Sequence, residues 1–367
     1  MDKIDKDTFF SELLVGDYSK LINQGVPQTD FGDVTEIQSG KKFFYKLKED
    51  SDLNKCHKVL TTRFLNKIPI NNSAKAFRSN QSYLNFIEPH RKNYYFIRID
   101  IKNFFHSISE DILKDCFSSY FEKQIVNTKS SSLLVDSFIN LVTLRLPENS
   151  KNEVFSNKII LPIGYKTSPI ISNIVFRKFD ILIQSLCSMH NIEYTRYADD
   201  LLFSSPKHSN TIHSTFFYNE ISFILSLGRF RINQKKLLSA KKILSIKGYT
   251  IDGTEDEKRL GTIRISNKKI KIIEKLLYEF DKGSSNIKIL RKVFKINAEK
   301  KKFKYKPKPE FIDKYAKDQV HNKTLGYRSY LISLIKFNQA YKCMDDKSIL
   351  KYLKLVKRLE KLALEIK

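Results

Sequence analysis

The sequence predicts an α+β fold, in which strands cluster in the middle of the chain and helices occupy most of the rest. Residues 94–101 (YYFIRIDI) are aromatic and β-branched, as is typical of a strand. Two short hydrophobic runs, 192–197 and 201–203, flank an acidic turn and predict a hairpin. From residue 267 onward, apolar residues recur at helical spacing. This separation of strands from helices indicates the α+β class.

Apolar spacing and turn-forming residues place the other elements. Residues 1–40 mix polar and apolar side chains and predict short helices, and residues 41–45 (KKFFY) predict a basic strand. Helices are expected over residues 53–67, 111–124 and 167–189. The polar stretches 127–132 and 147–156 are expected to be loops.

The clearest helical pattern lies in the last twenty residues or so. An apolar stripe with lysines on the opposite face predicts an amphipathic helix. The stripe comprises Ile349, Tyr352, Leu353, Val356, Leu359, Leu362, Ala363 and Ile366. Earlier, residues 295–309 hold seven lysines, Phe303, Tyr305 and two prolines. This segment is interpreted either as a loop near nucleic acid or as a solvated tether.

The charge balance narrows the class of partner. The 367 residues carry 66 Lys and Arg against 40 Asp and Glu, a formal net charge of +26. An enzyme of small metabolites has no use for such a field, whereas a protein that neutralises phosphates releases their counterions and gains affinity. A charged solvating surface is the alternative that composition leaves open. The length allows two or three domains, and 41% hydrophobic residues suffice for a large core.

Cysteine usage and hydropathy predict a protein of the cytoplasm. Cys56, Cys116, Cys187 and Cys343 lie far apart without a Cys-x-x-Cys pair, which argues against a zinc knuckle and a disulfide framework. The sequence has no apolar run of about 18 residues that would predict a membrane span. Residues 1–10 lack the apolar core of a signal peptide.

Three aspartates in two strand contexts are the strongest chemical signal. Asp100 closes the strand at residues 94–101, and Asp199 and Asp200 lie at the tip of the predicted hairpin. Acids between apolar strands are costly to bury without a cation, and Mg²⁺ binds carboxylates together with substrate phosphates. Two such ions about 4 Å apart stabilise both the attacking and the leaving oxygen of a phosphoryl transfer. A turn or cap residue is the alternative for any one of these acids alone.

Five segments, in order, resemble motifs of the reverse transcriptases. They are residues 99–105 (IDIKNFF), 161–169 (LPIGYKTSP, with Asn173 beyond it), 197–200 (YADD), 231–236 (RINQKK) and Gly248-Tyr249 at a primer-grip hairpin. The resemblance implies an RNA-directed DNA polymerase with a right-hand architecture. The N-terminal region and fingers would occupy residues 1–98, the palm 99–255 with finger elements around 160–180, and a helical, basic, RNA-binding thumb 256–367.

The resemblance assigns catalytic roles to individual residues. Asp100, Asp199 and Asp200 would hold two Mg²⁺ ions. Phe105 would be the steric gate that excludes a ribose 2′-hydroxyl and so selects dNTPs. Lys236, with Lys235 as the alternative, would protonate the leaving pyrophosphate.

The other assigned residues would bind the nucleotide or the templating base pair. Ile163 and Gly164 would line that base pair, with Gly164 allowing close backbone approach, and Ser168 belongs to the same motif. Lys42 or Arg78 would meet the triphosphate. The family carries Gln where this chain has Ile163, and an apolar side chain cannot hydrogen-bond the nucleotide. We therefore expect altered nucleotide binding or fidelity, not loss of catalysis.

Within the family, the chain most resembles the bacterial retron type. Residues 79–85 (SNQSYLN), continuing to Pro89-His90, are similar to a retron segment. The retron hallmark Asn-Ala-x-x-His is reduced here to its histidine, and Val-Thr-Gly is replaced by residues 246–248 (IKG). His90 is either a packed histidine or an RNA contact.

The retron resemblance implies an enzyme that recognises a structured noncoding RNA, primes from a 2′-hydroxyl within it and copies part of it. The product would be a branched, RNA-linked single-stranded DNA. Such systems pair with an effector protein and serve antiphage defence. The basic helices from residue 267 to 367 would form the RNA-recognition surface.

Two other interpretations remain open. A non-retron bacterial defence enzyme or a group II intron-like reverse transcriptase would share the chemistry but differ in template and primer. A catalytically silent RNA-binding scaffold would keep the fold alone, and the intact Asp100, Asp199 and Asp200 argue against it. Incorporation of dNTPs on a primed RNA template, lost when Asp199 and Asp200 become Asn, distinguishes an enzyme from a scaffold.

Overall fold

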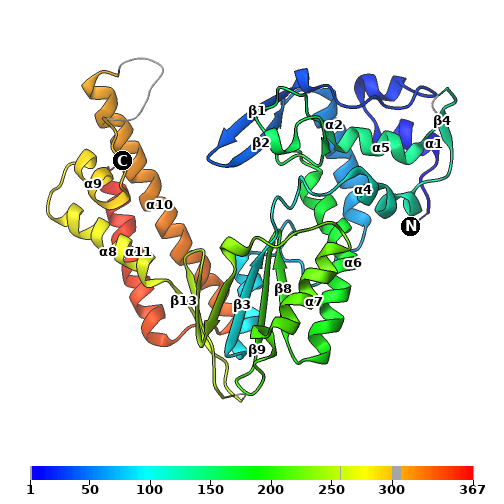
Figure 1. The fold of residues 1–367 in the computed structure, drawn as a ribbon. Coiled ribbons are helices and arrows are strands. Elements are labelled where there is room, and N and C mark those ends of the chain that lie inside the picture. Colours follow the sequence, from blue (N-terminus) through cyan, green and yellow to red (C-terminus); the bar gives the residue numbers. More distant parts are fainter. Residues whose placement is uncertain (1, 130, 257, 300–306, 367) are drawn as a thin grey trace. The chain divides into compact units, whose positions relative to one another are not determined.

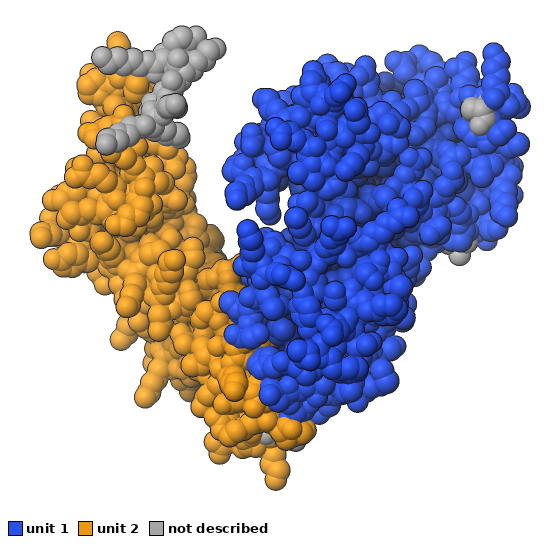
Figure 2. Space-filling model, in the orientation of Figure 1, with its two compact units in different colours: residues 1–86, 97–205, 209–239 blue, residues 87–96, 206–208, 240–367 orange. Residues whose placement is uncertain are grey.

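The computed structural model describes residues 2–129, 131–256, 258–299 and 307–366. The chain divides into two compact units (Figure 2). The first comprises residues 1–86, 97–205 and 209–239, and the second comprises residues 87–96, 206–208 and 240–367. Each unit has its own buried apolar side chains.

The first unit combines helices with mostly short strands (Figure 1). Its helices are α1 (Lys6–Thr8), α2 (Asp52–Val59), α3 (Tyr83–Ile87), α4 (Glu110–Phe117), α5 (Leu134–Val142), α6 (Ser168–Met189) and α7 (Thr215–Ser226). Its strands are β1 (Val34–Ser39), β2 (Lys42–Leu47), β3 (Tyr95–Asp100), β4 (Ile125–Asn127), β5 (Ser132–Leu133), β6 (Leu144–Arg145), β7 (Ile159–Ile160), β8 (Glu193–Tyr197), β9 (Asp200–Ser205) and β10 (Leu238–Lys241). The boundary of the unit falls inside α3, β3 and β10.

A four-stranded sheet in the order β10-β3-β9-β8 carries the predicted acidic residues. Strands β8 and β9 are antiparallel, and helices α6 and α7 run beside them (Figure 1). Every residue of β9 is buried, so this strand is covered on both faces and its sequence DLLFSS lacks polar alternation. The pairs β1–β2, β4–β5 and β6–β7 form separate two-stranded sheets.

Two groups of phenylalanine rings pack the interior of the first unit. Phe104, Phe176, Phe179 and Phe230 form one group, with neighbouring ring centroids 5.2 to 5.8 Å apart. Phe64, Phe117, Phe121 and Phe138 form the other. Ring pairs in such edge or tilted contacts stabilise the fold beyond the contribution of their buried apolar area. The first group fixes the segment that follows Asp100 against helix α6.

In its described residues, the second unit contains a small sheet and four α-helices. The antiparallel sheet contains β11 (Ile243–Ile246), β12 (Tyr249–Asp252) and β13 (Thr262–Ile265). The helices are α8 (Asn267–Asp281), α9 (Asn286–Phe294), α10 (Pro309–Tyr341) and α11 (Asp346–Ile366). Lys247 and Gly248 connect β11 to β12 with φ values of 45° and 94°, as two-residue hairpin turns require.

The predicted α+β fold is confirmed, and the expected helix at 167–189 and hairpin at 192–203 agree closely with α6 and β8–β9. Two element predictions are wrong. Residues 34–39 form strand β1, because they pair with β2 instead of forming a short helix. The helix expected over 111–124 ends at Phe117, and the chain turns so that Phe121 joins the aromatic cluster and Glu122 bonds to Ile4.

The stripe predicted on the last helix needs one correction. Leu353 is 42% exposed, whereas Leu355 is 6% exposed and takes its place in the interior. In the lysine-rich segment, residues 300–306 lie outside the described residues, and the three-domain division of 1–98, 99–255 and 256–367 stays a prediction. In the part of the chain that the structure describes, no helix is long and apolar enough to cross a membrane.

Candidate active site

The tip of the β8–β9 hairpin carries the acidic pair. Tyr197 pairs with Asp200, so Ala198 and Asp199 form a two-residue turn. Ala198 has a φ of 57°, in the left-handed region, which costs a residue with a Cβ about 1–2 kcal/mol. Such a residue persists only where its surroundings hold it. The placement of Asp199 therefore depends on contacts that keep this turn in shape.

Asp100 lies at the end of β3, beside β9 in the sheet. The N–H of Ile101 donates to the carbonyl of Asp199 at 2.9 Å, which attaches the chain after Asp100 to the acidic turn. The N–H of Asn233 donates to the carbonyl of Asp100 at 2.8 Å. Backbone hydrogen bonds thus bring together three of the predicted motifs.

The Asp100 carboxylate is buried and balanced by a cation. Its side chain is 3% exposed, and it accepts hydrogen bonds from Lys236 Nζ at 3.0 and 2.9 Å and from Asn233 Nδ2 at 2.9 Å. Charge-assisted hydrogen bonds of this kind offset the loss of hydration. The Lys236 side chain is 48% exposed, so its ammonium reaches Asp100 from the solvent side.

The Asp200 carboxylate has a cationic partner of its own. Arg98 lies two residues before Asp100 on β3, and both its Nε, at 2.9 Å, and its Nη2 donate to Asp200 Oδ1. The Asp200 side chain is 1% exposed and that of Arg98 is 17% exposed. Burial alone would lower the pKa of Arg98, but the Asp200 carboxylate outweighs it and the pKa is raised.

The predicted metal ligands fit a divalent cation by their chemistry, because carboxylate oxygens are the ligands that Mg²⁺ prefers. The arrangement of the side chains is different from a formed site. Among the residues described here, no three His, Cys, Asp or Glu side chains lie close enough together to hold a metal ion. Lys236 and Arg98 balance the charges of Asp100 and Asp200. Binding of a metal ion by Asp100 would require Lys236 to shift, because its ammonium contacts both oxygens of that carboxylate.

The predicted gate and the predicted glycine lie in constrained surroundings. Phe105 is half-buried, with its ring 5.4 Å from Phe104 and 6.1 Å from Phe77 between centroids. Gly164 has a φ of 120°, and a Cβ there would lie 2.6 Å from the carbonyl oxygen of Tyr45. Tyr45 on β2 also holds the residue before Gly164, because the Tyr45 N–H donates to the carbonyl of Ile163 at 2.7 Å. Only glycine fits this approach.

Three other predicted binding residues make contacts within the protein or lie on its surface. The buried hydroxyl of Ser168 donates to the carbonyl of Pro162 at 2.7 Å and so holds the motif in shape. Arg78 Nη1 donates to two carbonyls of its own loop, at 3.1 and 3.2 Å. Lys42 is exposed at the start of β2. Their roles in substrate binding stay predictions.

Comparison with known proteins identifies the family. A model described as "Reverse transcriptase (RNA-dependent DNA polymerase)" matches residues 49–251, more than half of the chain. The match includes Asp100, Asp199, Asp200 and Lys236. The chain belongs to the reverse transcriptase family. Its activity is that of an RNA-directed DNA polymerase, and the predicted right-hand polymerase class of α+β fold is confirmed.

The reverse transcriptase is similar to curated bacterial retron enzymes, which confirms the predicted retron resemblance. It is 26% identical over 253 residues to "Retron Ec83 reverse transcriptase" of Escherichia coli, covering 68% of this chain and 73% of that enzyme. It is 30% identical over 178 residues to "Retron Ec73 reverse transcriptase" of the same organism, covering 47% and 52%. A solved telomerase from Candida albicans in complex with a TWJ fragment of telomeric RNA is similar with a TM-score of 0.44 and 11% identity, over 95% of this chain and 63% of that one. That likeness carries no inference about function.

His90, the one residue of the retron hallmark that this sequence keeps, lies in the interior of the reverse transcriptase. His90 is 0% exposed, and its carbonyl accepts a hydrogen bond from the N–H of Asn93 at 3.1 Å. Its burial favours the packed histidine over the RNA contact.

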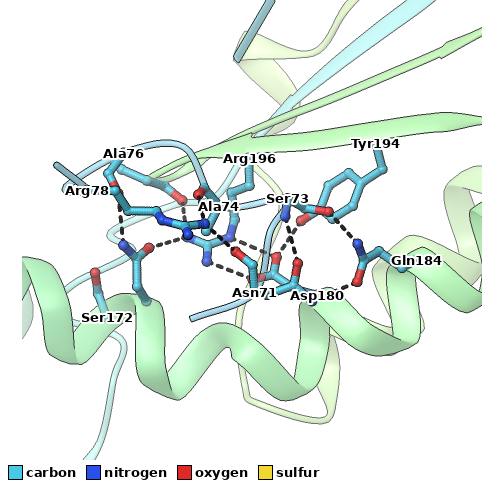
Figure 3. A network of polar contacts seen from close by, with 12 residues as sticks. Asn71, Ser73, Ala74, Ala76, Arg78, Ser172, Asp180, Gln184, Tyr194 and Arg196 are labelled. Carbon is cyan, nitrogen blue, oxygen red and sulfur yellow. Dashed lines mark hydrogen bonds and ion pairs between the residues drawn. The ribbon is translucent and has the colours of Figure 1, made fainter. Parts of the chain in front are cut away.

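Sequence reasoning did not single out the charged residues that hold the site, which are Arg98, Asp180 and Arg196. Arg196 on β8 and Asp180 on α6 form an ion pair in which both side chains are 0% exposed (Figure 3). Burial alone would lower the pKa of Arg196, but Asp180 outweighs it and the pKa is raised. A signal was present, because an arginine inside a buried strand and an acid on an apolar helix both need partners.

Proposed function

We propose that this reverse transcriptase copies a structured noncoding RNA into a branched, RNA-linked single-stranded DNA, as the polymerase of an antiphage retron. The observation that carries the proposal is the similarity to the retron Ec83 reverse transcriptase over 253 residues. The formal charge of +26 supports a large RNA ligand. The proposal also includes a cytoplasmic location and a separate effector protein as partner.

The thumb is the part of the chain that we assign to RNA recognition. We place it at residues 256–367, after fingers at 1–98 and a palm at 99–255. On α11 most apolar side chains are buried, although Leu350, Leu353 and Leu364 are exposed. Its exposed lysines are Lys347, Lys351, Lys354, Lys357 and Lys361. Cations spaced along a helix suit contacts to phosphates, which are independent of base sequence.

At the active site, Asp100, Asp199 and Asp200 would together hold two Mg²⁺ ions. When bound, such ions stabilise the charge on the attacking and leaving oxygens of phosphoryl transfer. Lys236, 2.9 Å from Asp100 and half-exposed, would leave that carboxylate and donate its proton to the leaving pyrophosphate. Arg98 would stay bound to Asp200 while Lys236 leaves Asp100, because the Arg98 side chain is the less exposed of the two cations.

Selection of the nucleotide falls to the neighbouring segments. Phe105 would exclude a ribose 2′-hydroxyl, since its ring is supported by Phe104 at 5.4 Å. Gly164, whose missing Cβ lets the Tyr45 backbone approach, and the neighbouring apolar side chain of Ile163 would line the templating base pair. Lys42, exposed on β2, would approach the triphosphate.

The test is to express the gene with its flanking DNA, purify the protein and analyse the nucleic acid that copurifies. Aliquots are treated with RNase, DNase or a debranching enzyme before a denaturing gel. A discrete DNA band that shifts on debranching, and is lost in Asp199→Asn with Asp200→Asn, supports the proposal. Asp111→Asn is the matched control, because that carboxylate is 76% exposed and forms only a 3.4 Å surface pair with Arg229. The control should give the band.

A second candidate is a bacterial reverse transcriptase outside the retrons. The specific observation that favours it is the departure of residues 86–90 (FIEPH) and 246–248 (IKG) from the retron hallmarks. DNA of mixed length without an RNA branch would support this candidate. RNA with no DNA at all would contradict both and indicate a silent RNA-binding scaffold.

A further inference from the structure

Beneath the acidic turn, a buried arginine joins segments that are far apart in sequence. The guanidinium of Arg196 donates from Nε and Nη2 to the two oxygens of Asp180, at 2.9 and 2.8 Å. Tyr194 OH donates to the same carboxylate at 2.8 Å. The guanidinium also stacks on the ring of Phe176, with Cζ 4.5 Å from its centroid. Figure 3 shows Arg196 between helix α6 and the loop that holds Ser73, Ala74 and Ala76.

The charge pair alone gives little reason to keep this arrangement. Buried ion pairs can often be replaced by apolar side chains of similar volume without loss of stability. What an apolar replacement could not reproduce are the directional hydrogen bonds from the remaining nitrogen. Arg196 Nη1 donates to the carbonyl of Ala198 at 3.2 Å and to Asn173 Oδ1 at 3.1 Å.

The first of these bonds acts on the catalytic turn. Ala198 is the left-handed residue, with a φ of 57°, that directly precedes Asp199. Its carbonyl is fixed by a guanidinium whose other edge is anchored on helix α6. Arg196 thereby opposes relaxation of the turn, and with it any displacement of the Asp199 carboxylate.

The second bond leads to the loop before helix α3. Asn173 Nδ2 donates to the carbonyl of Ala76 at 2.9 Å. The backbone of Arg196 holds the same loop, because its N–H donates to Ser73 and its carbonyl accepts from Lys75, both at 2.8 Å. One residue therefore attaches this loop to the strand that ends at the acidic turn.

The loop presents an unusual aromatic residue to the predicted gate. Phe77 directly follows Ala76, has a φ of 59° and is 45% exposed. Its ring lies edge-on to that of Phe105, with centroids 6.1 Å apart and planes at 62°. A bulky residue in the left-handed region is an outlier that its surroundings must hold in place. Asn173 provides such a hold through Ala76.

We propose that Arg196 and Asn173 are positioning residues which join the acidic turn to the loop bearing Phe77, and that Phe77 helps to select the sugar by supporting Phe105. Arg196 sets the position of Asp199 and so affects turnover. Asn173 sets the position of Phe77 and so affects discrimination between deoxyribonucleotides and ribonucleotides. The second half of the proposal rests on the assignment of Phe105 as the gate.

The turnover half is tested with a variant that removes the charges but keeps the volume. Asp180→Leu, Arg196→Met and Tyr194→Phe together leave neither a buried unpaired charge nor the hydroxyl that bonds to Asp180. We expect a melting temperature within a few degrees of the unmodified enzyme and a kcat about 10- to 100-fold lower, because small displacements of reacting groups have effects of this size. The KM for dNTP should change much less.

A triple variant with unmodified stability and unmodified kcat would overturn the turnover half. If that variant does not fold, Arg196→Lys tests the same claim. A lysine can pair with Asp180, but it lacks the forked guanidinium needed to donate to Ala198 and Asn173 at the same time. A folded Arg196→Lys enzyme with full kcat overturns it equally. Arg177→Met on α6, the helix that carries Asp180, is the control, since its guanidinium donates to the Pro69 carbonyl and to the Tyr120 hydroxyl.

The specificity half is measured as the ratio of kcat/KM for a dNTP to that for the matching rNTP on a primed RNA template. Asn173→Asp keeps the acceptor for Arg196 but loses the donor to Ala76, and we expect it, like Phe77→Leu, to lower the ratio about tenfold, more than it lowers kcat. Phe105→Val should lower the ratio further. If Phe105→Val acts and the other two do not, the role of Phe77 is wrong and the gate stands. If Phe105→Val has no effect, the gate assignment and this half of the proposal both fail.

Discussion

The carboxylates of Asp100 and Asp200, at the rim of the active site, have partly exposed cationic partners. The carboxylate of Asp180, in the interior, has a fully buried one. Asp100 and Asp200 are buried, but their partners Lys236 and Arg98 have side chains 48% and 17% exposed. Asp180 and Arg196 are both 0% exposed. A half-exposed cation can move into water at small cost, whereas removal of one partner from a fully buried pair leaves an uncompensated charge. Lys236 at the rim is therefore placed to leave its partner, whereas the interior pair is built for fixed geometry.

The largest expected effect comes from the acid at the turn. Asp199→Asn removes the charge of a carboxylate that we propose to bind metal, while leaving the turn and its backbone hydrogen bonds in place. We expect dNTP incorporation on a primed RNA template to fall at least ~1,000-fold, equivalent to about 4 kcal/mol of transition-state stabilisation. The melting temperature should change by no more than a few degrees. A variant that keeps a tenth of the activity would contradict the role of Asp199.

The next effect separates the interior pair from the rim pairs. Asp180→Leu alone should lower the free energy of unfolding by about 3–5 kcal/mol, because it leaves Arg196 buried without a counter-charge. Equilibrium denaturation in urea measures this loss. Asp100→Asn is the matched comparison at the rim, where Lys236 is free to turn to solvent, and its loss should be much smaller. Equal losses for the two variants would break the contrast between rim and interior.

Variants of Lys236 test whether release of this lysine from Asp100 contributes to the chemical step. Lys236→Met should lower kcat about 100-fold, within the range typical of a lost general acid. The free energy of unfolding should fall by less than it does for Asp180→Leu, because the Lys236 side chain is 48% exposed, although that of Asp100 is 3% exposed. Rapid-quench measurement of single-nucleotide addition checks the rate of the chemical step. Lys235→Met serves as the control, and a larger rate loss for Lys235 would reverse the assignment.

Two buried histidines extend the contrast to groups without a counter-charge. Burial lowers the pKa of His57 and of His106 to about 4, below the usual value of about 6.5. Between these values the unfolded chain binds more protons than the folded one, so stability is present above pH 6.5 and is lost as the pH falls toward 4. From pH 7 to pH 5 each histidine should account for about 2 kcal/mol of lost stability.

Denaturation of His106→Leu at both pH values measures the share of that histidine. The variant should lose about 2 kcal/mol less than the unmodified protein over this interval. His208→Leu is the control, because His208 is exposed. Identical losses for His106→Leu and the unmodified chain would mean that folding does not lower the pKa of His106.

How far the sequence predicted the molecule depends on the range of each interaction. Helix α6 and the β8–β9 hairpin were predictable because the periodicity and the turn are local. The sequence could point to the three acids and Lys236 because their motifs keep a fixed order along the chain, and the roles of these residues stay predictions. The ion pair between Arg98 and Asp200 was not predicted, since the two residues lie on strands β3 and β9, which are neighbours only after folding. Arg78 was expected to meet the triphosphate, and that role stays a prediction. Its hydrogen bonds to two carbonyls of its own loop are contacts that no spacing rule reveals.

The smallest expected effect concerns Ile163, which we expect to line the templating base pair. Its side chain is only partly buried, and its carbonyl accepts from Tyr45 whatever the side chain is. Ile163→Gln should therefore fold normally and restore a hydrogen-bonding group beside the nucleotide. We expect the KM for dNTP to fall by up to about tenfold, or 1.4 kcal/mol, and the misincorporation frequency to change with it. Ile163→Leu keeps the site apolar and should change neither quantity. If Ile163→Gln matches Ile163→Leu in both, the side chain at 163 does not contact the nucleotide, and fidelity is set deeper in the site, by the fixed geometry beneath the turn.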